Sequence, residues 1–137
     1  MKKILLATLA VAVAMGAAAL YGKNESSHAQ RVGMVIGIKS DQISAYEALH
    51  AASNPGVRDL LTKYHMHNFS IFIHQLDDGK YYLFGYYDYT GSDYAGDMAR
   101  LSAEPRNQKW LSVTDPLQSP LQGEKSWAKM QEVYHNP

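Results

Sequence analysis

The sequence predicts an α+β domain with the element order β-α-β-β-α-β, the ferredoxin-like pattern of an antiparallel sheet with both helices on one side. Three observations lead to this prediction. Two apolar runs, residues 68–75 and 80–89, flank Asp77-Asp78-Gly79, and this arrangement is typical of a β-hairpin. Apolar residues at helical spacing precede the hairpin and follow it. The 137 residues leave room for one domain.

The elements before the hairpin follow from apolar spacing and from helix-breaking residues. A continuous apolar run over 32–38 predicts a buried first strand. Ser40 or Asp41 is expected to cap the helix that follows, because both residue types favour that position. The run Asn-Pro-Gly at 54–56 should end or redirect this helix, and 57–64 reads as a further helical stretch.

The elements after the hairpin are predicted in the same way. Ser92 or Asp93 can cap the next helix, and Pro105 can open another, since proline is favoured in a first helical turn. The predicted elements are a helix over 94–103, a short helix over 105–113, a loop over 115–125 and a final strand over 130–134.

Both faces of the predicted sheet carry apolar or aromatic side chains. Phe69, Ile71 and Ile73 alternate with Phe72 on one strand of the hairpin, and aromatic residues fall on both faces of the other. Helices on one side would leave the second apolar face open, which is unusual for a monomer. We therefore expect a homodimer in which two copies pack sheet against sheet, as in a dimeric α+β barrel.

The N-terminus resembles a secretory signal peptide. Two lysines precede an apolar run over 4–20, and Ser27-His28-Ala29 provides small residues at a plausible cleavage point. We expect residues 1–29 to be a signal peptide and leader, residues 30–137 to be the domain, and the protein to be exported to the periplasm or secreted. Cleavage within 17–19 and an uncleaved membrane anchor are the alternatives.

Composition narrows the classes of function. The formal net charge is zero, which does not favour a nucleic-acid groove. The chain has no cysteine, so it has no thiol nucleophile and no disulfide framework. It has 10 tyrosines, which suit a wet and partly buried pocket because each combines an apolar body with a polar tip.

His50 is the candidate proton-transfer residue. Ile43, Tyr46 and His50 follow helical spacing, so the imidazole and the phenol share one face of the first helix. Histidine can both give and accept a proton near neutral pH. The alternative is a core histidine that a backbone or tyrosine partner satisfies, and the residues alone favour this alternative.

Other candidates have weaker patterns. His65 and His67 form an H-x-H pair that could bind a metal with His74 or Asp88, but no third ligand is evident in sequence, so we predict no metal site. Trp110 could stack on a sugar ring or fill the core, and composition favours the core.

Taken as a whole, the sequence from about residue 31 to the C-terminus resembles the L-rhamnose mutarotase family. Each motif is weak alone, but their order and spacing make the match fairly specific. The matching features are the first strand, Tyr46-x-x-x-His50, the segment His67-Asn68-Phe69-Ser70-Ile71-Phe72, Gln108-Lys109-Trp110 with Thr114-Asp115, and the ending Met130-Gln131-Glu132-Val133-Tyr134 that closes at Pro137.

This resemblance implies a dimeric, cofactor-free isomerase that interconverts the α and β anomers of L-rhamnose, with a monosaccharide as its partner. The family's proton-donating histidine matches His50, and its sugar-contacting tyrosine matches Tyr46. Phe69 stands where the family has a tyrosine, and Trp110 is the remaining member of a tryptophan pair, so both are expected to form apolar walls. A non-catalytic sugar-binding protein and a monooxygenase-like enzyme of the same fold are the alternatives.

Overall fold

The computed structural model describes residues 29–136. The predicted signal peptide lies outside this range, except for Ala29. No helix among the described residues has the length and apolar character that crossing a membrane requires.

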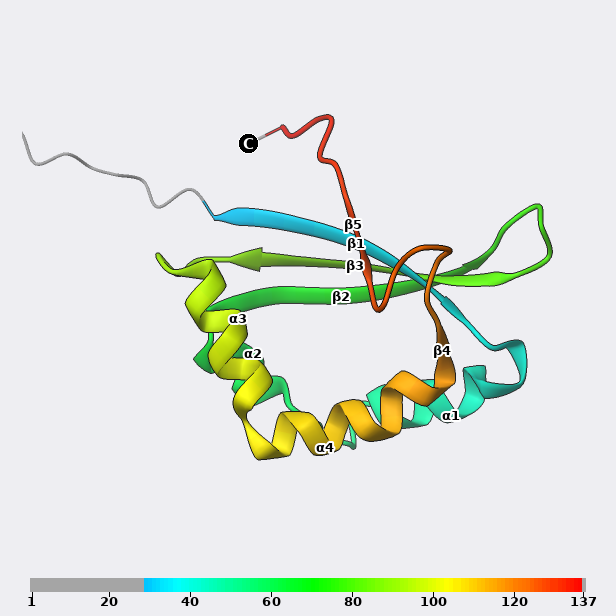
Figure 1. The fold of residues 1–137 in the computed structure, drawn as a ribbon, viewed down its shortest axis with the longest axis horizontal. Helices are drawn as coiled ribbons and strands as arrows, with labels where there is room; N and C mark the ends of the chain where they lie inside the picture. Colours follow the sequence, from blue (N-terminus) through cyan, green and yellow to red (C-terminus); the bar gives the residue numbers. More distant parts are fainter. Residues whose placement is uncertain (1–28, 137) are drawn as a thin grey trace, which may run out of the picture.

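The sheet is antiparallel and has the strand order β2-β3-β1-β4, with β5 also paired to β1 (Figure 1). This order confirms the predicted ferredoxin-like α+β fold. The strands are β1 (Gln30–Ile38), β2 (Met66–Gln75), β3 (Tyr81–Tyr89), β4 (Gln118–Ser119) and β5 (Ala128–Met130).

The predicted final strand over 130–134 is wrong, because β5 ends at Met130. The chain beyond β5 is tied to β1 through side chains in place of a backbone ladder: the Arg31 guanidinium donates to both carboxylate oxygens of Glu132, at 2.8 and 3.2 Å. The predicted loop over 115–125 also contains β4, two residues that pair with the end of β1.

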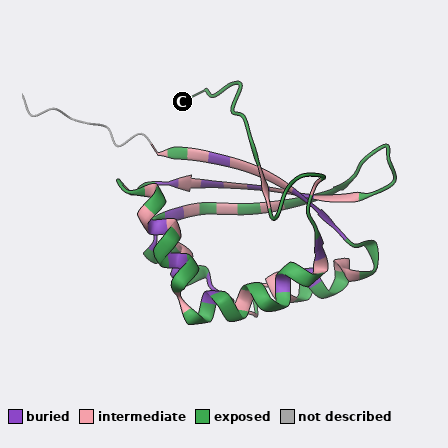
Figure 2. Cartoon of the chain, viewed as in Figure 1, coloured by how far each residue is buried: buried purple, intermediate pink, exposed green. Residues whose placement is uncertain are grey.

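All helices lie on one side of the sheet, with α4 and α1 running along it (Figure 1). Figure 2 shows that their outward surfaces are exposed. The helices are η1 (Ser40–Gln42), α1 (Ile43–His50), α2 (Arg58–Lys63), α3 (Tyr94–Ala103), α4 (Pro105–Thr114) and η2 (Asp115–Leu117).

The predicted caps have different outcomes. The Asp93 carboxylate accepts a hydrogen bond from Gly96 N at 3.0 Å and caps α3, as expected. Neither Ser40 nor Asp41 caps α1, because both belong to the 3₁₀ turn η1 that leads directly into the helix.

The core between helices and sheet is divided into two clusters. The first gathers around Leu60, Tyr87 and Leu101, and Trp110 packs against it. The second gathers around Ile36, Tyr46 and Leu83. Members of both clusters, among them Leu101 and Tyr46, line the cleft that is described below.

A β-bulge determines which side chains of β2 face the helices. Asn68 and Phe69 together oppose Tyr87, and the pairing resumes at Ser70 with Tyr86. Asn68 adopts a left-handed φ of 52° there, a conformation that asparagine tolerates better than most residues. Phe69 therefore packs on Tyr87, on the helix-covered face, at 5.4 Å between ring centroids.

Candidate active site

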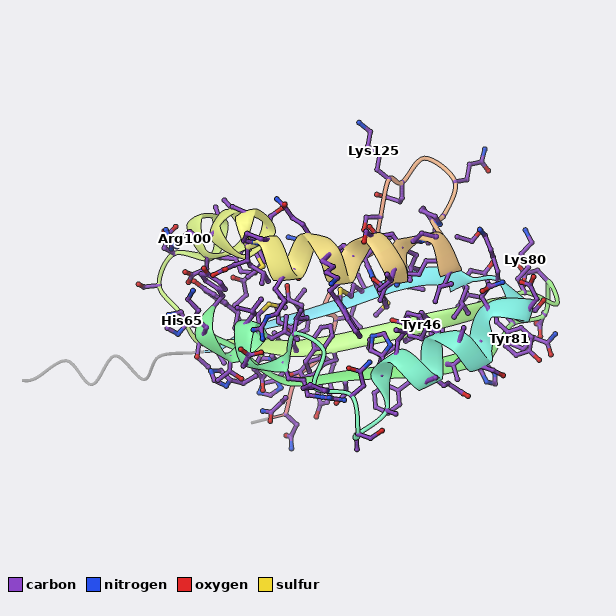
Figure 3. All side chains as sticks on the ribbon, turned by 90° about the horizontal axis from the view of Figure 1, so that it is seen from below. Tyr46, His65, Lys80, Tyr81, Arg100 and Lys125 are labelled. Atoms are coloured by element: carbon purple, nitrogen blue, oxygen red, sulfur yellow. The ribbon has the colours of Figure 1, made fainter. Side chains whose placement is uncertain are left out.

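A cleft of about 800 Å³ lies among α1, α2, α4 and strand β2. All four site residues predicted from the sequence line it: Tyr46, His50, Phe69 and Trp110. Figure 3 shows Tyr46 in the space between α1 and α4. The fold thus brings together side chains from three separate segments of the chain.

His50 is the last residue of α1 and is half-buried. Its Nδ1 lies 2.9 Å from the carbonyl oxygen of Tyr46, one turn earlier. A carbonyl oxygen can only accept a hydrogen bond, so we assign the hydrogen to Nδ1. In the neutral ring Nε2 then carries the lone pair and is the nitrogen available to a ligand.

The surroundings of His50 favour its neutral form. Burial lowers the pKa of the imidazole, the hydrogen bond to Tyr46 opposes this effect, and the nearby Arg58 charge lowers the pKa further. Neutral imidazole is the form that can accept a proton from a bound hydroxyl group.

Aromatic rings hold the imidazole on two sides. The Tyr46 ring stacks on His50 with centroids 4.1 Å apart, and Trp110 meets it edge-on at 5.2 Å. Gly56 allows this arrangement: its φ is +54°, and a Cβ there would lie 3.2 Å from the Trp110 ring. The glycine of the predicted helix break therefore also serves as the surface on which Trp110 rests.

Arg58 fixes the end of the helix that carries His50. Its guanidinium donates to the carbonyl oxygens of His50 at 2.9 Å and Ala51 at 3.2 Å, and also to that of Asn54. The carbonyls of His50 and Ala51 are among those that the end of α1 leaves without intrahelical partners. Sequence reasoning missed Arg58, because the contact depends on how the chain turns between α1 and α2.

Tyr46 is buried, and its burial raises the pKa of the phenol to about 12, an effect that the neighbouring Gln118 amide opposes. The phenol is therefore protonated at neutral pH and can donate a hydrogen bond. The Asp115 carboxyl group lies nearby, and its own burial raises its pKa.

Several further lining residues were not predicted as site residues. They are Arg58, Asn107, Asp115, Gln118 and Trp127. Asp115 appeared in the sequence only as part of a family motif. The others carry no periodic or motif signal, because packing of distant segments brings them to the cleft.

No group of three histidine, aspartate or glutamate side chains within residues 29–136 is arranged to hold a metal ion. His65 takes a left-handed φ of 63° immediately before β2, while His67 lies within the strand. His65 and His67 therefore do not occupy alternate positions of one regular strand, the arrangement that would point both side chains to the same side.

The likeness to solved structures supports the fold. An L-rhamnose mutarotase from Formosa agariphila is 19% identical, with a TM-score of 0.58, over 79% of this chain and 99% of that one. A protein assigned to the antibiotic biosynthesis monooxygenases, from Nitrosomonas europaea, is 15% identical, with a TM-score of 0.50, over 79% of this chain and 93% of that one. At these identities the likeness concerns the fold alone.

Sequence comparison distinguishes between the mutarotases and the monooxygenases that share this fold. No curated protein matches the chain significantly. The family model described as L-rhamnose mutarotase, however, matches residues 31–136, which is almost the whole described domain. The chain therefore belongs to the L-rhamnose mutarotase family, a family of isomerases that interconvert sugar anomers.

Proposed function

We propose that this protein interconverts the α and β anomers of L-rhamnose or a related deoxysugar, with His50 transferring the proton. The observation that carries the proposal is the half-buried imidazole at the cleft, whose Nδ1 is engaged by the Tyr46 carbonyl. This leaves Nε2 as the nitrogen for the sugar. A cleft of about 800 Å³ accommodates a monosaccharide.

In the proposed reaction, Nε2 of neutral His50 takes the proton from the anomeric hydroxyl group. The bond between the anomeric carbon and the ring oxygen breaks, and the ring oxygen receives that proton from the imidazolium. The carbonyl at the former anomeric carbon then rotates, and the hydroxyl group formed from the ring oxygen attacks its other face. Nε2 takes the proton of this hydroxyl group and delivers it to the carbonyl oxygen, which becomes the anomeric hydroxyl group of the other anomer. One imidazole suffices because both oxygens are bonded to the same carbon.

Tyr46 and the apolar walls have supporting roles in this proposal. The phenol stays protonated near neutral pH, since its pKa is about 12, and it orients the sugar by donating a hydrogen bond. Trp110 and Phe69 contact the less polar faces of the ring. Since Phe69 lacks the hydroxyl group of a tyrosine, sugar preference is expected to differ from that of relatives that have one.

The test is anomer exchange by saturation-transfer NMR on L-rhamnose, with L-fucose as a comparison sugar. His50→Gln should reduce the enzyme-dependent exchange rate at least ~100-fold, the typical contribution of a positioned acid/base group. His65→Gln is the matched control, since His65 is exposed just before β2 and lies outside the cleft. An unchanged rate in His50→Gln contradicts the mechanism, and calorimetric binding without exchange by the wild type supports a non-catalytic sugar-binding protein.

We further propose a homodimer that covers the helix-free face of the sheet. The register places Phe72, Phe84, Val35 and Ala128 in one row across β2, β3, β1 and β5 on that face. Phe72 is 65% exposed. This apolar row supports burial against a second copy, because monomers rarely expose such a patch.

Light scattering at micromolar concentration should give the mass of two chains. Met130→Glu, which places a charge on this face, should give the mass of one. Leu76→Glu is the control, since Leu76 is equally exposed at 43% but lies just after β2, at the hairpin turn. A monomeric wild type, or a dimeric Met130→Glu variant, argues against the interface.

Export is proposed from the sequence of residues 1–29, a basic start followed by an apolar run. Expression of the full chain and N-terminal sequencing of the periplasmic product should give Gln30 as the first residue. An intact N-terminus in the cytoplasmic fraction contradicts the proposal.

A further inference from the structure

Asn107 is a buried amide with no side-chain hydrogen bond to another residue of the described range. It lies in the first turn of α4 and is only 6% exposed. Arg106 and Gln108 on either side of it form side-chain hydrogen bonds, but none is found for Asn107 with another of residues 29–136, although buried polar groups nearly always have such a partner. Leaving an amide unpaired is unfavourable, so a residue of this kind needs an explanation.

Asn107 is one of the residues that line the cleft. Among the described residues, no side-chain nitrogen or oxygen is both fully shielded from solvent and without a hydrogen bond. The unpaired amide atoms therefore reach accessible space, and the space that Asn107 lines is the cleft.

Asn107 lies beside the position proposed for the sugar. It precedes Trp110 by three residues on the inward face of α4, and Trp110 meets the His50 ring at 5.2 Å. Residues three apart on a helix are neighbours. An anomeric carbon placed at His50 would thus leave the opposite side of the same ring within reach of the amide.

The cleft lining that includes Asn107 also contains apolar residues. Met98, Leu101 and Phe69 are among them, and none of these three can bond to a hydroxyl group. An amide both donates and accepts, so it matches a secondary hydroxyl group, which does the same. A site with one such amide rejects a ligand that lacks this hydroxyl, because the amide then stays unpaired.

The first turn of α4 is held in place from outside the cleft. Glu104 accepts hydrogen bonds from Lys63 Nζ at 2.5 Å and from Tyr64 Oη at 2.6 Å, and Arg106 pairs with Asp59. These contacts fix the turn to α2 and its flanking residue Tyr64 without engaging Asn107. The turn is therefore positioned while the amide remains available.

We propose that Asn107 determines sugar specificity by hydrogen-bonding a ring hydroxyl group remote from the anomeric carbon. This inference rests on the proposed function, since it places the sugar in the same cleft. The other buried amide of the cleft, Gln118, differs because it lies beside the Tyr46 hydroxyl. Asn107 is thus the amide free to distinguish one sugar from another.

The test compares L-rhamnose with its 3-deoxy and 4-deoxy analogues in the wild type and in Asn107→Leu. In the wild type, one of the two analogues should bind about tenfold more weakly than L-rhamnose. Asn107→Leu should weaken L-rhamnose binding by a similar factor and leave binding of that analogue unchanged. It should also keep kcat within about twofold, because the hydrogen bond is expected to be equally strong in the bound sugar and in the transition state. Equal weakening for all three sugars, or no weakening, overturns the proposal.

Stability and a direct spectroscopic signal separate this role from a structural one. Because the amide bonds to no described residue, Asn107→Leu should melt at or above the wild-type temperature, whereas a structural amide would lower it. Asn107→Asp keeps the shape and removes the donor, so it should also lose discrimination.

The side-chain ¹⁵N–¹H resonances of Asn107, assigned by their loss in the variant, should shift on adding L-rhamnose. A shift without anomer exchange sustains this inference while the proposed reaction fails, and an unshifted amide at saturation overturns the inference.

Discussion

Two polar regions of the helical layer differ in how their buried groups are satisfied. In Figure 3, Arg100 and His65 lie together at one end of the molecule, and Tyr46 lies between α1 and α4, away from that end. At the first end, the buried Asp97 carboxylate accepts from Tyr89 Oη at 2.6 Å and from Arg100 at 2.7 Å. Each carboxylate oxygen is engaged.

In the cleft, by contrast, polar groups keep an unused bonding position. His50 uses one ring nitrogen within the protein, and the Asn107 amide uses neither of its groups with another described residue. A saturated network stabilises a fold, whereas unpaired groups in a cavity are left for a ligand. The comparison therefore distinguishes structural polar groups from functional ones within one small domain.

The largest expected effect is on the stability of the fold, at the end of the molecule where both oxygens of Asp97 are hydrogen-bonded. Asp97→Leu leaves Tyr89 and Arg100 without their shared partner and should lower the melting temperature more than any cleft substitution discussed above. Anomer exchange at 20 °C should persist, because Asp97 lies outside the cleft. Differential scanning calorimetry and NMR exchange test this, with Asp77→Leu in the exposed hairpin turn as the control.

The same substitution has a defined pH dependence. The hydrogen bonds from Tyr89 and Arg100 lower the pKa of Asp97 in the folded protein. The stabilisation is therefore complete above the unfolded-state pKa, which is about 4, and is lost as the pH falls through the lower folded-state pKa. The difference in melting temperature between wild type and Asp97→Leu should shrink below about pH 4. A difference that stays constant down to pH 2 would show that the carboxylate charge is not involved.

The next effect concerns His50, which has only one of its two ring nitrogens hydrogen-bonded within the protein. Because the pKa of His50 is lowered, kcat/KM should be level at neutral pH and fall about tenfold per unit only below the usual histidine value of about 6.5. Arg58→Gln removes a positive charge near His50 and should move this acid limb to higher pH. Arg106→Gln removes the same charge outside the cleft and should leave the limb in place. A limb that moves equally in both variants argues against a local effect on His50.

The smallest effect tests the backbone support of the cleft. Gly56→Ala and Gly79→Ala each place a side chain at a left-handed φ, at +54° and +76°, and each should cost about 1–2 kcal/mol of unfolding free energy. Only Gly56→Ala should also raise KM severalfold, since its Cβ would press on Trp110 while nothing lies within 4 Å of a Cβ at Gly79. Urea unfolding measures the free energy of unfolding, and anomer-exchange kinetics measure KM. Equal KM values in the two variants would show that Trp110 does not contribute to sugar binding.

Local rules predicted the parts of the fold that depend on neighbouring residues. The hairpin with Gly79, helix α3 with its Asp93 cap, and the pair Tyr46 and His50 on one helix face all follow from spacing within about ten residues. The predicted last strand failed because β4 and β5 are two and three residues long and carry no periodicity.

The composition of the cleft was less predictable for a related reason. Arg58, Asn107 and Trp127 reach it through packing between segments far apart in the chain. The family resemblance located His50 and Tyr46, which match the family pattern. It gave no indication of Asn107, whose significance depends on burial and on an unpaired amide, two properties that only coordinates reveal.

The bulge in β2 has a consequence for how such proteins diverge. Asn68 and Phe69 share a single partner on β3, so the pairing on either side does not depend on which side chain position 69 carries. A lineage can exchange a ring with a hydroxyl group for one without it and keep every strand in register. Substrate range can thereby evolve at this position while the scaffold that holds the imidazole stays the same.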